Sequence, residues 1–311
     1  MAESMSIKNR VKSLLEEQGI SQSQAANLIG ISAAALSGYL KGTYTGDVKA
    51  VEIKIEKWLT AEQRRSEKFR SISAVPSYIA LSTSKKIEQT CEYAQYAVDI
   101  GVVYGAAGTG KTYTIRHYAD SNPNVWLATM TAAHAGVSAC LEEIALALDM
   151  RGAPGRSARL LRDIYSRVRD TAGLLVVDEA QHLFPAALEV IRSIHDAGGI
   201  GVVLVGNESV YARLTGGART ATFAQLFSRI GKRLRIVRPL KADVLGVAKA
   251  FGVEGSKAQQ AAWEIGRKPG GLRGVVKTLR IAGVLAAGAG KDIDETFIKA
   301  AWLDLSGEAT G

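Results

Sequence analysis

The octapeptide at residues 105–112 constrains the fold more than any other stretch of the chain. It reads GAAGTGKT and follows a short apolar run at residues 100–104. A strand that feeds a glycine-rich loop ending in Lys-Thr is typical of a phosphate-binding loop. The glycines let the backbone wrap so that its N–H groups point at phosphate oxygens. The stretch therefore predicts a site for a nucleoside triphosphate.

Each side chain of this loop has an expected role. We expect Lys111 to reach the β- and γ-phosphates and Thr112 to offer its hydroxyl to Mg²⁺. A helix at residues 113–119 would direct its positive end at the anion. The residues expected to contact the nucleotide are Gly105, Gly108, Thr109, Gly110, Lys111 and Thr112.

A second motif, LLVVDEAQH at residues 174–182, places two carboxylates after a run of four apolar residues. We expect Asp178 to hold Mg²⁺, directly or through water, and Glu179 to polarise the attacking water as a general base. An acidic loop after a strand is the simpler alternative. The Asp-Glu pair favours hydrolysis over binding alone, and we interpret His182 as structural.

Three further polar residues are candidates for the hydrolytic site. Asn207 follows an apolar run at 200–205 and is expected to hydrogen-bond the attacking water or the γ-phosphate; the alternative is a turn residue. Arg229 follows a helix-like pattern and is expected to act in a neighbour's site as an arginine finger, with Arg213 and Arg219 as competitors. Arg273 begins a helix near the end of the chain and is expected to contact the γ-phosphate. Solvated surface arginines are the alternative for Arg229 and Arg273.

The chain divides into three predicted segments: 1–70, 71–240 and 241–311. In the first, Ser21 can cap a helix that ends near Ile29, Gly30 can turn, and Ser32 can cap a second helix that ends at Leu40. This pattern predicts a helix-turn-helix, with a plain three-helix bundle as the alternative. The second helix is poor in long polar side chains, so we expect weak sequence specificity or a role in assembly.

The middle segment alternates helical patterns with short apolar runs, which predicts an α/β fold with a parallel sheet covered on both faces. A charged stretch at 60–71, followed by Val-Pro-Ser, is interpreted as a linker. The last segment reads as helices. The expected strands are 101–104, 125–129, 174–177, 200–205 and 235–237.

Composition favours an intracellular protein with an anionic partner. The formal charge is +9 and the isoelectric point is near 9.5, and nucleic acid is the common partner of such a chain. No apolar stretch has the length of a membrane span, no signal peptide is visible, and Cys91 and Cys140 are expected to be buried free thiols. We therefore expect no membrane partner and a cytoplasmic location.

Three basic clusters are candidates for contact with DNA phosphates, with ordinary solvated faces as the alternative. The cluster that we favour contains Arg151, Arg156, Arg159 and Arg162. The second contains Lys232, Arg233, Arg235 and Arg238. The third contains Arg267, Lys268, Lys277 and Arg280.

These motifs together support a family resemblance. GAAGTGKT, VVDEAQH, VGN, FSRIGKR and GGLR occur in the order and spacing of the AAA+ ATPases. The N-terminal helix-turn-helix, the phrase PNVW and the stretch LTGGARTATFAQLFSRIGKR narrow the match. Over nearly all its length the chain resembles the B transposition protein family of phage Mu and its prophage relatives. This implies an AAA+ phosphate-loop core with a small helical lid, preceded by the all-α helix-turn-helix domain.

The resemblance also implies a function. Subunits with bound ATP and Mg²⁺ would assemble as a helical filament on double-stranded DNA of any sequence, in the cytoplasm of a bacterial host. The filament would present target DNA to a partner transposase and activate it, and DNA and the partner would stimulate ATP hydrolysis. A helix-turn-helix transcriptional regulator with a nucleotide-sensing ATPase module is the alternative, and a helicase loader is a third possibility.

Overall fold

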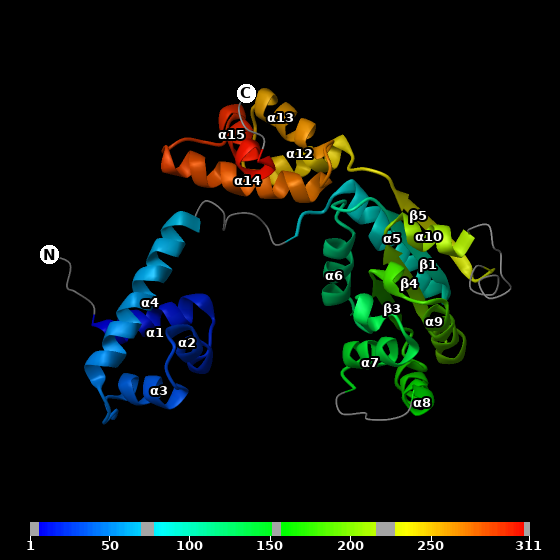
Figure 1. Cartoon of the computed structure of the whole chain (residues 1–311), viewed down its shortest axis with the longest axis horizontal. Helices are drawn as coiled ribbons and strands as arrows, with labels where there is room; N and C mark the ends of the chain where they lie inside the picture. The colour runs from blue at the N-terminus through cyan, green and yellow to red at the C-terminus, as the bar shows by residue number, and fades with distance from the viewer. Residues whose placement is uncertain (1–5, 70–77, 151–156, 216–227, 308–311) are drawn as a thin grey trace. The chain divides into compact units, whose positions relative to one another are not determined.

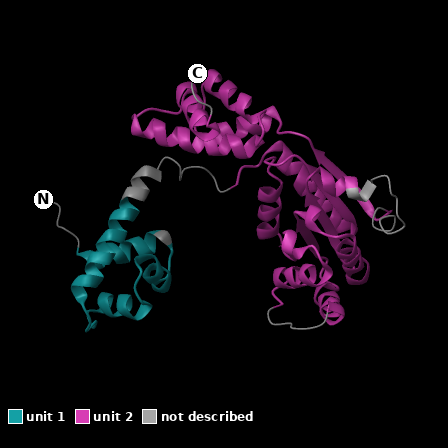
Figure 2. Ribbon diagram, viewed as in Figure 1, with its two compact units in different colours: residues 1–74 teal, residues 75–311 magenta. Residues whose placement is uncertain are grey.

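The computed structural model describes residues 6–69, 78–150, 157–215 and 228–307. The chain forms two compact units, residues 1–74 and residues 75–311 (Figure 2). Each unit has its own hydrophobic core. The described helices are all too short or too polar to span a bilayer.

The first unit is a helical bundle whose helix ends are set by local hydrogen bonds. Its helices are α1 (Ile7–Gln18), α2 (Gln22–Ile29), α3 (Ala33–Lys41) and α4 (Val48–Phe69). Ser21 Oγ accepts from the Gln24 amide at 3.2 Å while Gln24 Oε1 accepts from the Ser21 amide at 2.8 Å, a capping box. Ser32 caps α3 through one bond, in which its Oγ accepts from the Ala35 amide at 3.2 Å, and Gly30 turns between the helices with a φ of 76°. The expected helix ends at Ser21 and Ser32 are therefore confirmed.

The expected linker is wrong over residues 60–69, because α4 continues through Phe69. The stretch is rich in Glu, Gln, Arg and Lys, which are good helix formers, and it contains no Gly or Pro. Charge alone therefore did not end the helix. The rest of the expected linker, including Pro76, lies outside the described residues.

The second unit is built on a five-stranded parallel sheet in the order β2-β3-β4-β1-β5. Strands β1, β3, β4 and β5 are labelled in Figure 1. The strands are β1 (Ile100–Gly105), β2 (Val125–Thr129), β3 (Leu174–Asp178), β4 (Gly201–Gly206) and β5 (Ile230–Ile236). Because all strands are parallel, their carboxyl ends share one edge of the sheet. The loops that carry polar residues after β1, β3 and β4 therefore meet there.

Strand β5 begins five residues before the expected start at Arg235, because Ile230 already pairs with Ile100 of β1. Its sequence IGKRLRI alternates buried and more exposed positions at the sheet edge. Basic side chains at the exposed positions interrupt the apolar run by which a strand is usually predicted. Such side chains are also a common way to protect an edge strand from pairing with another chain.

Helices cover both faces of the sheet. One face packs on α5 (Ser82–Ala97) and α6 (Lys111–Ser121). The other packs on α7 (Val137–Ala147), α9 (Pro185–Gly198) and α10 (Glu208–Thr215), with α8 (Ser157–Val168) against α7 and α9. Alternate residues of β3 point to opposite layers: Val176 packs with the first and Val177 with the second. The two cysteines, both described, are buried and free, as expected.

Four helices after β5 form a smaller layer with its own core: α12 (Lys241–Ala250), α13 (Ser256–Gly266), α14 (Gly271–Gly288) and α15 (Glu295–Ser306). We call this layer the lid. A buried carboxylate ties it to the sheet layer. Asp243 of α12, only 1% exposed, accepts the Thr83 amide at 3.3 Å and the Thr83 hydroxyl at the start of α5.

Candidate nucleotide site at the carboxyl edge of the sheet

The loop between β1 and α6 passes so close to neighbouring backbone at two positions that only glycine fits there. Gly105 and Gly108 have φ values of 137° and 73°. A Cβ on Gly105 would collide with the carbonyl of Ile236 at the end of β5, and one on Gly108 would collide with the carbonyl of Gly270 before α14. The loop is therefore held between the sheet and the lid, with α6 starting directly after Gly110.

Lys111 folds over this loop. Its ammonium donates to the carbonyls of Gly105 at 2.9 Å and Ala106 at 2.8 Å. Burial lowers the pKa of Lys111, while the nearby carboxylates of Asp178 and Glu179 oppose that shift. A half-buried ammonium that bonds neutral carbonyls can exchange them for phosphate oxygens, whose negative charge strengthens the bond.

The side-chain oxygens of Asp178 and Thr112 lie side by side next to the loop. The Thr112 hydroxyl donates to Asp178 Oδ2 at 2.7 Å. Asp178 is 2% exposed, and burial raises the pKa of its carboxyl against the opposing hydrogen bond from Thr112. The described residues contain no cluster of three His, Cys, Asp or Glu side chains fit to hold a metal. One carboxylate and one hydroxyl nevertheless fit Mg²⁺, which commonly binds through one or two carboxylates together with substrate phosphates.

Glu179 occupies an unusual backbone position. Its φ and ψ of 55° and 34° lie in the left-handed region, which costs a non-glycine residue about 1 kcal/mol or more. Its amide donates to Asp178 Oδ1 at 2.9 Å. Its carboxylate accepts from the Gln181 side-chain amide. The turn after β3 thus directs both acidic side chains from adjacent residues to the same edge.

Asn207 lies at this edge too, directly after β4. Its Oδ1 accepts from the Ser209 amide at 2.9 Å and the Ser209 hydroxyl at 2.6 Å, and its own amide donates to Gln181 Oε1 at 3.2 Å. In this state the side chain stabilises the first turn of α10, which is the turn role left open from the sequence. Asn207 is connected to Glu179 because Gln181 bonds both residues. Asn207 therefore remains a candidate for the hydrolytic site.

The lid brings Arg273 to the phosphate loop. The Arg273 amide donates to the Gly108 carbonyl at 3.4 Å, and the charge of Arg273 contributes to the lowered pKa of Lys111. The structure therefore gathers residues from four separate motifs at one edge of the sheet. They are Lys111, Thr112, Asp178, Glu179, Asn207 and Arg273.

Arg229 lies at the opposite end of the strands, where they begin. It directly precedes β5, and its carbonyl accepts from the Ile100 amide at the start of β1. Its guanidinium Nε donates to Asp196 Oδ1 at 2.6 Å. An arginine here is remote from the phosphate loop of its own chain. Arg219 lies outside the described residues, as does the side chain of Arg213.

The basic cluster that we favoured is only partly described, because Arg151 and Arg156 lie outside the described residues. Arg159 and Arg162 lie on α8, which buries Leu160, Ile164 and Val168 against the core. Both arginines are exposed, and Arg159 is 3.9 Å from Asp163. They face solvent three residues apart, on one side of the helix.

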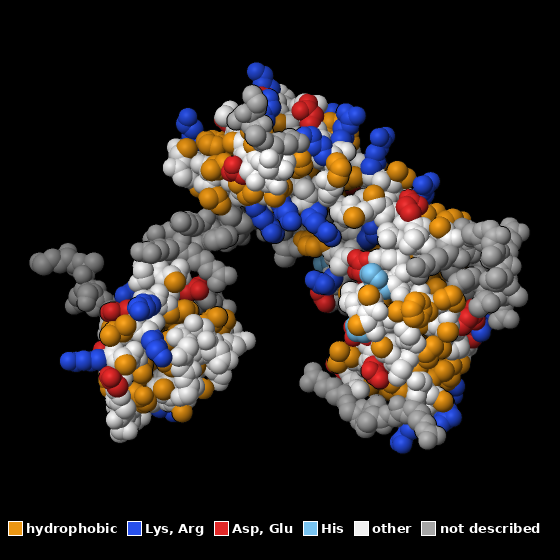
Figure 3. All heavy atoms as spheres, in the orientation of Figure 1, with side chains coloured by type: hydrophobic (Ala, Val, Ile, Leu, Met, Phe, Trp, Pro, Cys, Tyr) orange, Lys and Arg blue, Asp and Glu red, His pale blue; other side chains and the backbone are white. Residues whose placement is uncertain are grey.

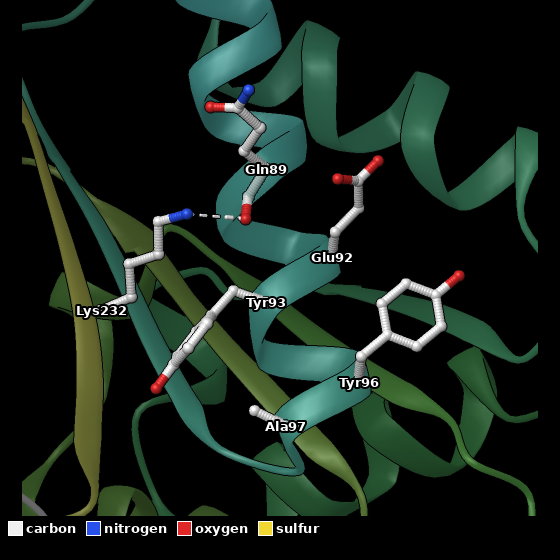
Figure 4. A pocket seen from close by; sticks show the side chains of 6 residues that line it. All are labelled: Gln89, Glu92, Tyr93, Tyr96, Ala97 and Lys232. Atoms are coloured by element: carbon white, nitrogen blue, oxygen red, sulfur yellow. Dashed lines mark hydrogen bonds between the residues drawn. The ribbon is translucent and has the colours of Figure 1, made fainter.

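The second cluster is divided between the two faces of the sheet, because neighbouring residues of a strand point in opposite directions. Lys232 turns toward α5, where its ammonium donates to the Gln89 carbonyl at 2.9 Å and lies over the Tyr93 ring. It lines an open hollow of about 540 Å³ beside α5 (Figure 4). Arg233 points the other way, as does Arg235, which pairs with Glu208 of α10 at 3.1 Å. Lys232 and Arg233 thus do not form one surface.

The third cluster is divided between two places. Arg267 is exposed directly after α13. Lys277 and Arg280 lie on α14, where they and Arg273 of the nucleotide site are exposed and recur at the spacing of one helix face. Figure 3 shows basic side chains gathered along this helix. Lys268 lies apart, with its ammonium 4.6 Å from the centroid of the Trp302 ring.

Two residues in contact with candidate site residues were not identified from the sequence. Gln181 was left without a role although it lies in the acidic motif, and its place in LLVVDEAQH was the available signal. Asp196 had no signal, because its partner Arg229 lies 33 residues away.

Family models match three parts of the chain. Residues 11–47 match a helix-turn-helix model, residues 96–214 an AAA domain model, and residues 228–305 the C-terminal model of the Mu B transposition protein. The expected helix-turn-helix and AAA+ fold are thereby confirmed.

Curated relatives match nearly the whole chain. The ATP-dependent target DNA activator B of Escherichia phage Mu is 36% identical over 302 residues, which cover 96% of this chain and 95% of the relative. The Mu-like prophage FluMu DNA transposition protein B of Haemophilus influenzae is 39% identical over 279 residues, covering 88% and 95%.

Solved structures share the fold at low identity. A chain of Drosophila ORC bound to DNA aligns with a TM-score of 0.53 and 14% identity, covering 78% of this chain and 67% of that one. The Aeropyrum pernix ORC1 protein in complex with DNA has the same TM-score and 16% identity, covering 74% and 66%.

Proposed function

The chain belongs to the Mu B transposition protein family, and on that premise we propose that it is an ATPase that binds target DNA of any sequence and activates a partner transposase. The observation that carries the hydrolytic part is the convergence of Lys111, Thr112, Asp178 and Glu179 at one edge of the sheet. The relative from phage Mu is named an ATP-dependent target DNA activator.

The phosphate loop binds and orients ATP in this proposal. The backbone from Gly105 to Gly110 and the ammonium of Lys111 hold the β- and γ-phosphates. Thr112 and Asp178 would hold Mg²⁺, which when bound neutralises charge that develops on the phosphate oxygens. Arg273 adds a positive charge from the lid, so that the lid position depends on the nucleotide.

Glu179 removes a proton from the attacking water. Its carboxylate accepts a hydrogen bond from the attacking water and takes its proton as the oxygen bonds to the γ-phosphorus, while ADP leaves. Asn207 orients the same water or the γ-phosphate. Both groups follow buried strands, so they are presented from a rigid scaffold.

Arg229 completes the site of a neighbouring subunit. It lies at the edge opposite the phosphate loop, where it cannot reach its own nucleotide but is available to a second copy stacked head to tail. ATP at such an interface favours assembly, and repetition of the interface builds a helical filament around DNA. Hydrolysis removes the γ-phosphate and weakens the interface.

DNA contacts in the filament come from basic side chains that face solvent. Arg159 and Arg162 on α8 belong to the cluster that we favour, together with Arg151 and Arg156, which precede them in the sequence. The contribution of Lys232 and Arg233 is divided between two faces. Phosphate contacts carry no base information, which suits a protein that accepts many targets. We place this activity in the cytoplasm of a bacterial host, where transposase and DNA stimulate hydrolysis.

The first test is DNA binding by the full chain with ATP, ADP or no nucleotide. Random-sequence duplexes of increasing length are titrated and imaged by electron microscopy. We expect filaments with ATP only, on any sequence, and affinity that rises with duplex length. Tight binding to one sequence without nucleotide or polymer would contradict the proposal and favour the transcriptional regulator.

The Glu179→Gln substitution separates assembly from disassembly. The variant keeps the shape of the side chain but cannot accept the proton, so we expect ATP binding and filament formation with hydrolysis lost. Filaments of this variant should persist in excess ATP, and rapid dissociation measured by competition with unlabelled DNA would refute the role of hydrolysis in disassembly.

A further inference from the structure

Gln181 bridges two of the motifs that converge at the nucleotide site. Its side-chain N–H donates to Glu179 Oε2, and its Oε1 accepts the amide of Asn207 at 3.2 Å. One neighbour is an acceptor and the other a donor, so only one orientation of the carboxamide satisfies both. The group thus connects the turn after β3 to the turn after β4.

We propose that Gln181 is the positioning residue for the general base, and this rests on the proposed role of Glu179. Asp178 already holds the backbone of residue 179 through the 2.9 Å bond to its amide. The carboxylate lies at the end of a flexible side chain and needs a second support. Gln181 supplies it by bonding one carboxylate oxygen, which leaves the other oxygen to accept the proton of water.

The surroundings of Gln181 are shaped to hold it. Residue 206, the last of β4, is a glycine, and a Cβ there would collide with Oε1 of Gln181 and lie 2.5 Å from Val210 Cγ2. The carboxamide therefore fills the space that a side chain at position 206 would occupy. Substitution at Gly206 should displace Gln181 without changing its chemistry.

The test compares the steady-state ATPase kinetics of purified full-length variants at saturating DNA. Gln181→Leu keeps a similar volume but removes both hydrogen bonds. We expect its kcat to fall about 10- to 100-fold, the range that loosened alignment of a reacting group produces. KM for ATP, and affinity for a fluorescent ATP analogue, should stay within about twofold because the phosphate loop is untouched.

Two further variants separate positioning from general damage. Gln181→Glu keeps an acceptor for the Asn207 amide but replaces the donor to Glu179 by a second carboxylate. The two negative charges repel each other, so we expect the same loss of kcat. Gly206→Ala should reproduce the loss by displacing the carboxamide. A fall in melting temperature together with weaker nucleotide binding in all three would instead indicate a structural role and overturn the proposal.

The chain offers matched controls. Gln95 also bridges two elements, with Nε2 donating to the Ala172 carbonyl at 3.2 Å and Oε1 accepting from the Tyr118 hydroxyl at 3.1 Å, and it lies on α5 outside the site. Gln95→Leu should leave kcat unchanged. Gly136→Ala is the control for Gly206, because a Cβ there would meet nothing within 4 Å.

The Glu179→Gln background distinguishes failure of this inference from failure of the proposed function. If Glu179 is the base and Gln181 acts through it, adding Gln181→Leu to Glu179→Gln should reduce the residual rate no further. Normal hydrolysis by Glu179→Gln alone would remove the proposed base. Loss of hydrolysis in Glu179→Gln with a normal kcat in Gln181→Leu would overturn only the positioning role.

Discussion

Asp196 accepts hydrogen bonds from two guanidinium groups at the edge of the sheet that lies away from the phosphate loop. One oxygen bonds Nε of Arg229 at 2.6 Å and the other bonds Arg192, which also pairs with Glu189 at 2.8 Å. Glu189, Arg192 and Asp196 all belong to α9. The proposed finger is therefore aligned by a helix that starts just after the acidic motif.

Substituting Asp196 tests this alignment at the scale of one residue. Asp196→Ala should leave Arg229 without that anchor, and we expect the ATPase rate in the presence of DNA to fall on the order of 10-fold or more while ATP binding is retained. Asp304→Ala, at an exposed position of α15, is the control. An unchanged or raised ATPase rate in Asp196→Ala would argue against the alignment.

Burial of the two cysteine thiols predicts that they react slowly with an alkylating reagent in the folded protein. Burial raises the pKa of both Cys91 and Cys140 to about 12. At pH 8 the folded protein should contain on the order of a thousandfold less thiolate than an unfolded chain. Alkylation followed by mass spectrometry should find both residues unmodified in the native protein and modified in denaturant, whereas rapid modification of the native protein would contradict their burial.

Residues of the site differ in how visible they are in the sequence. Lys111 and Thr112 were predictable because the loop needs them at fixed spacing, and Asp178 because it ends an apolar run. Gln181 lay inside a recognised motif, but its proposed role depends on contacts with both Glu179 and Asn207 that appear only in the folded chain. Asp196 was invisible, since its contact with Arg229 depends on the fold that brings α9 beside β5.

Elements follow the same division between local and distant causes. The starts of α2 and α3 were predictable because serine caps act within three residues. The start of β5 was not, because pairing with β1 rather than its own apolar content makes Ile230 part of the strand. The length of α4 was also missed, because strong helix propensity continued through a stretch whose charge suggested a linker.

The tie between α5 and α12 gives a prediction at the scale of elements. Asp243→Ala would leave the buried donors of Thr83 unpaired, which costs about 1–3 kcal/mol. We expect faster hydrogen exchange in α12 and a lower denaturation midpoint for the lid. Asp292→Ala, which removes an exposed carboxylate, should match the wild-type protein. Equal exchange in both variants would show that this tie contributes little.

At the scale of the whole molecule, the two edges of the sheet carry different halves of the proposed catalytic site. A phosphate loop at one end of the strands and an arginine at the other cannot meet within one chain, but they would meet if copies stacked in one direction. In the proposed assembly, activity would therefore depend on neighbouring subunits. This arrangement also explains why hydrolysis and assembly would be coupled in a protein whose first unit is a separate helix-turn-helix.

A mixing experiment tests that arrangement. Lys111→Ala loses phosphate binding but keeps Arg229, whereas Arg229→Ala keeps the phosphate loop but offers no finger, so each variant alone should be inactive. In an equal mixture about one interface in four joins an intact loop to an intact finger, because the contact is head to tail. ATPase should therefore reappear at roughly a quarter of the wild-type rate on long duplex DNA. If the mixture stays inactive while both variants still co-assemble, or if Arg229→Ala alone is fully active, Arg229 does not act on a neighbour.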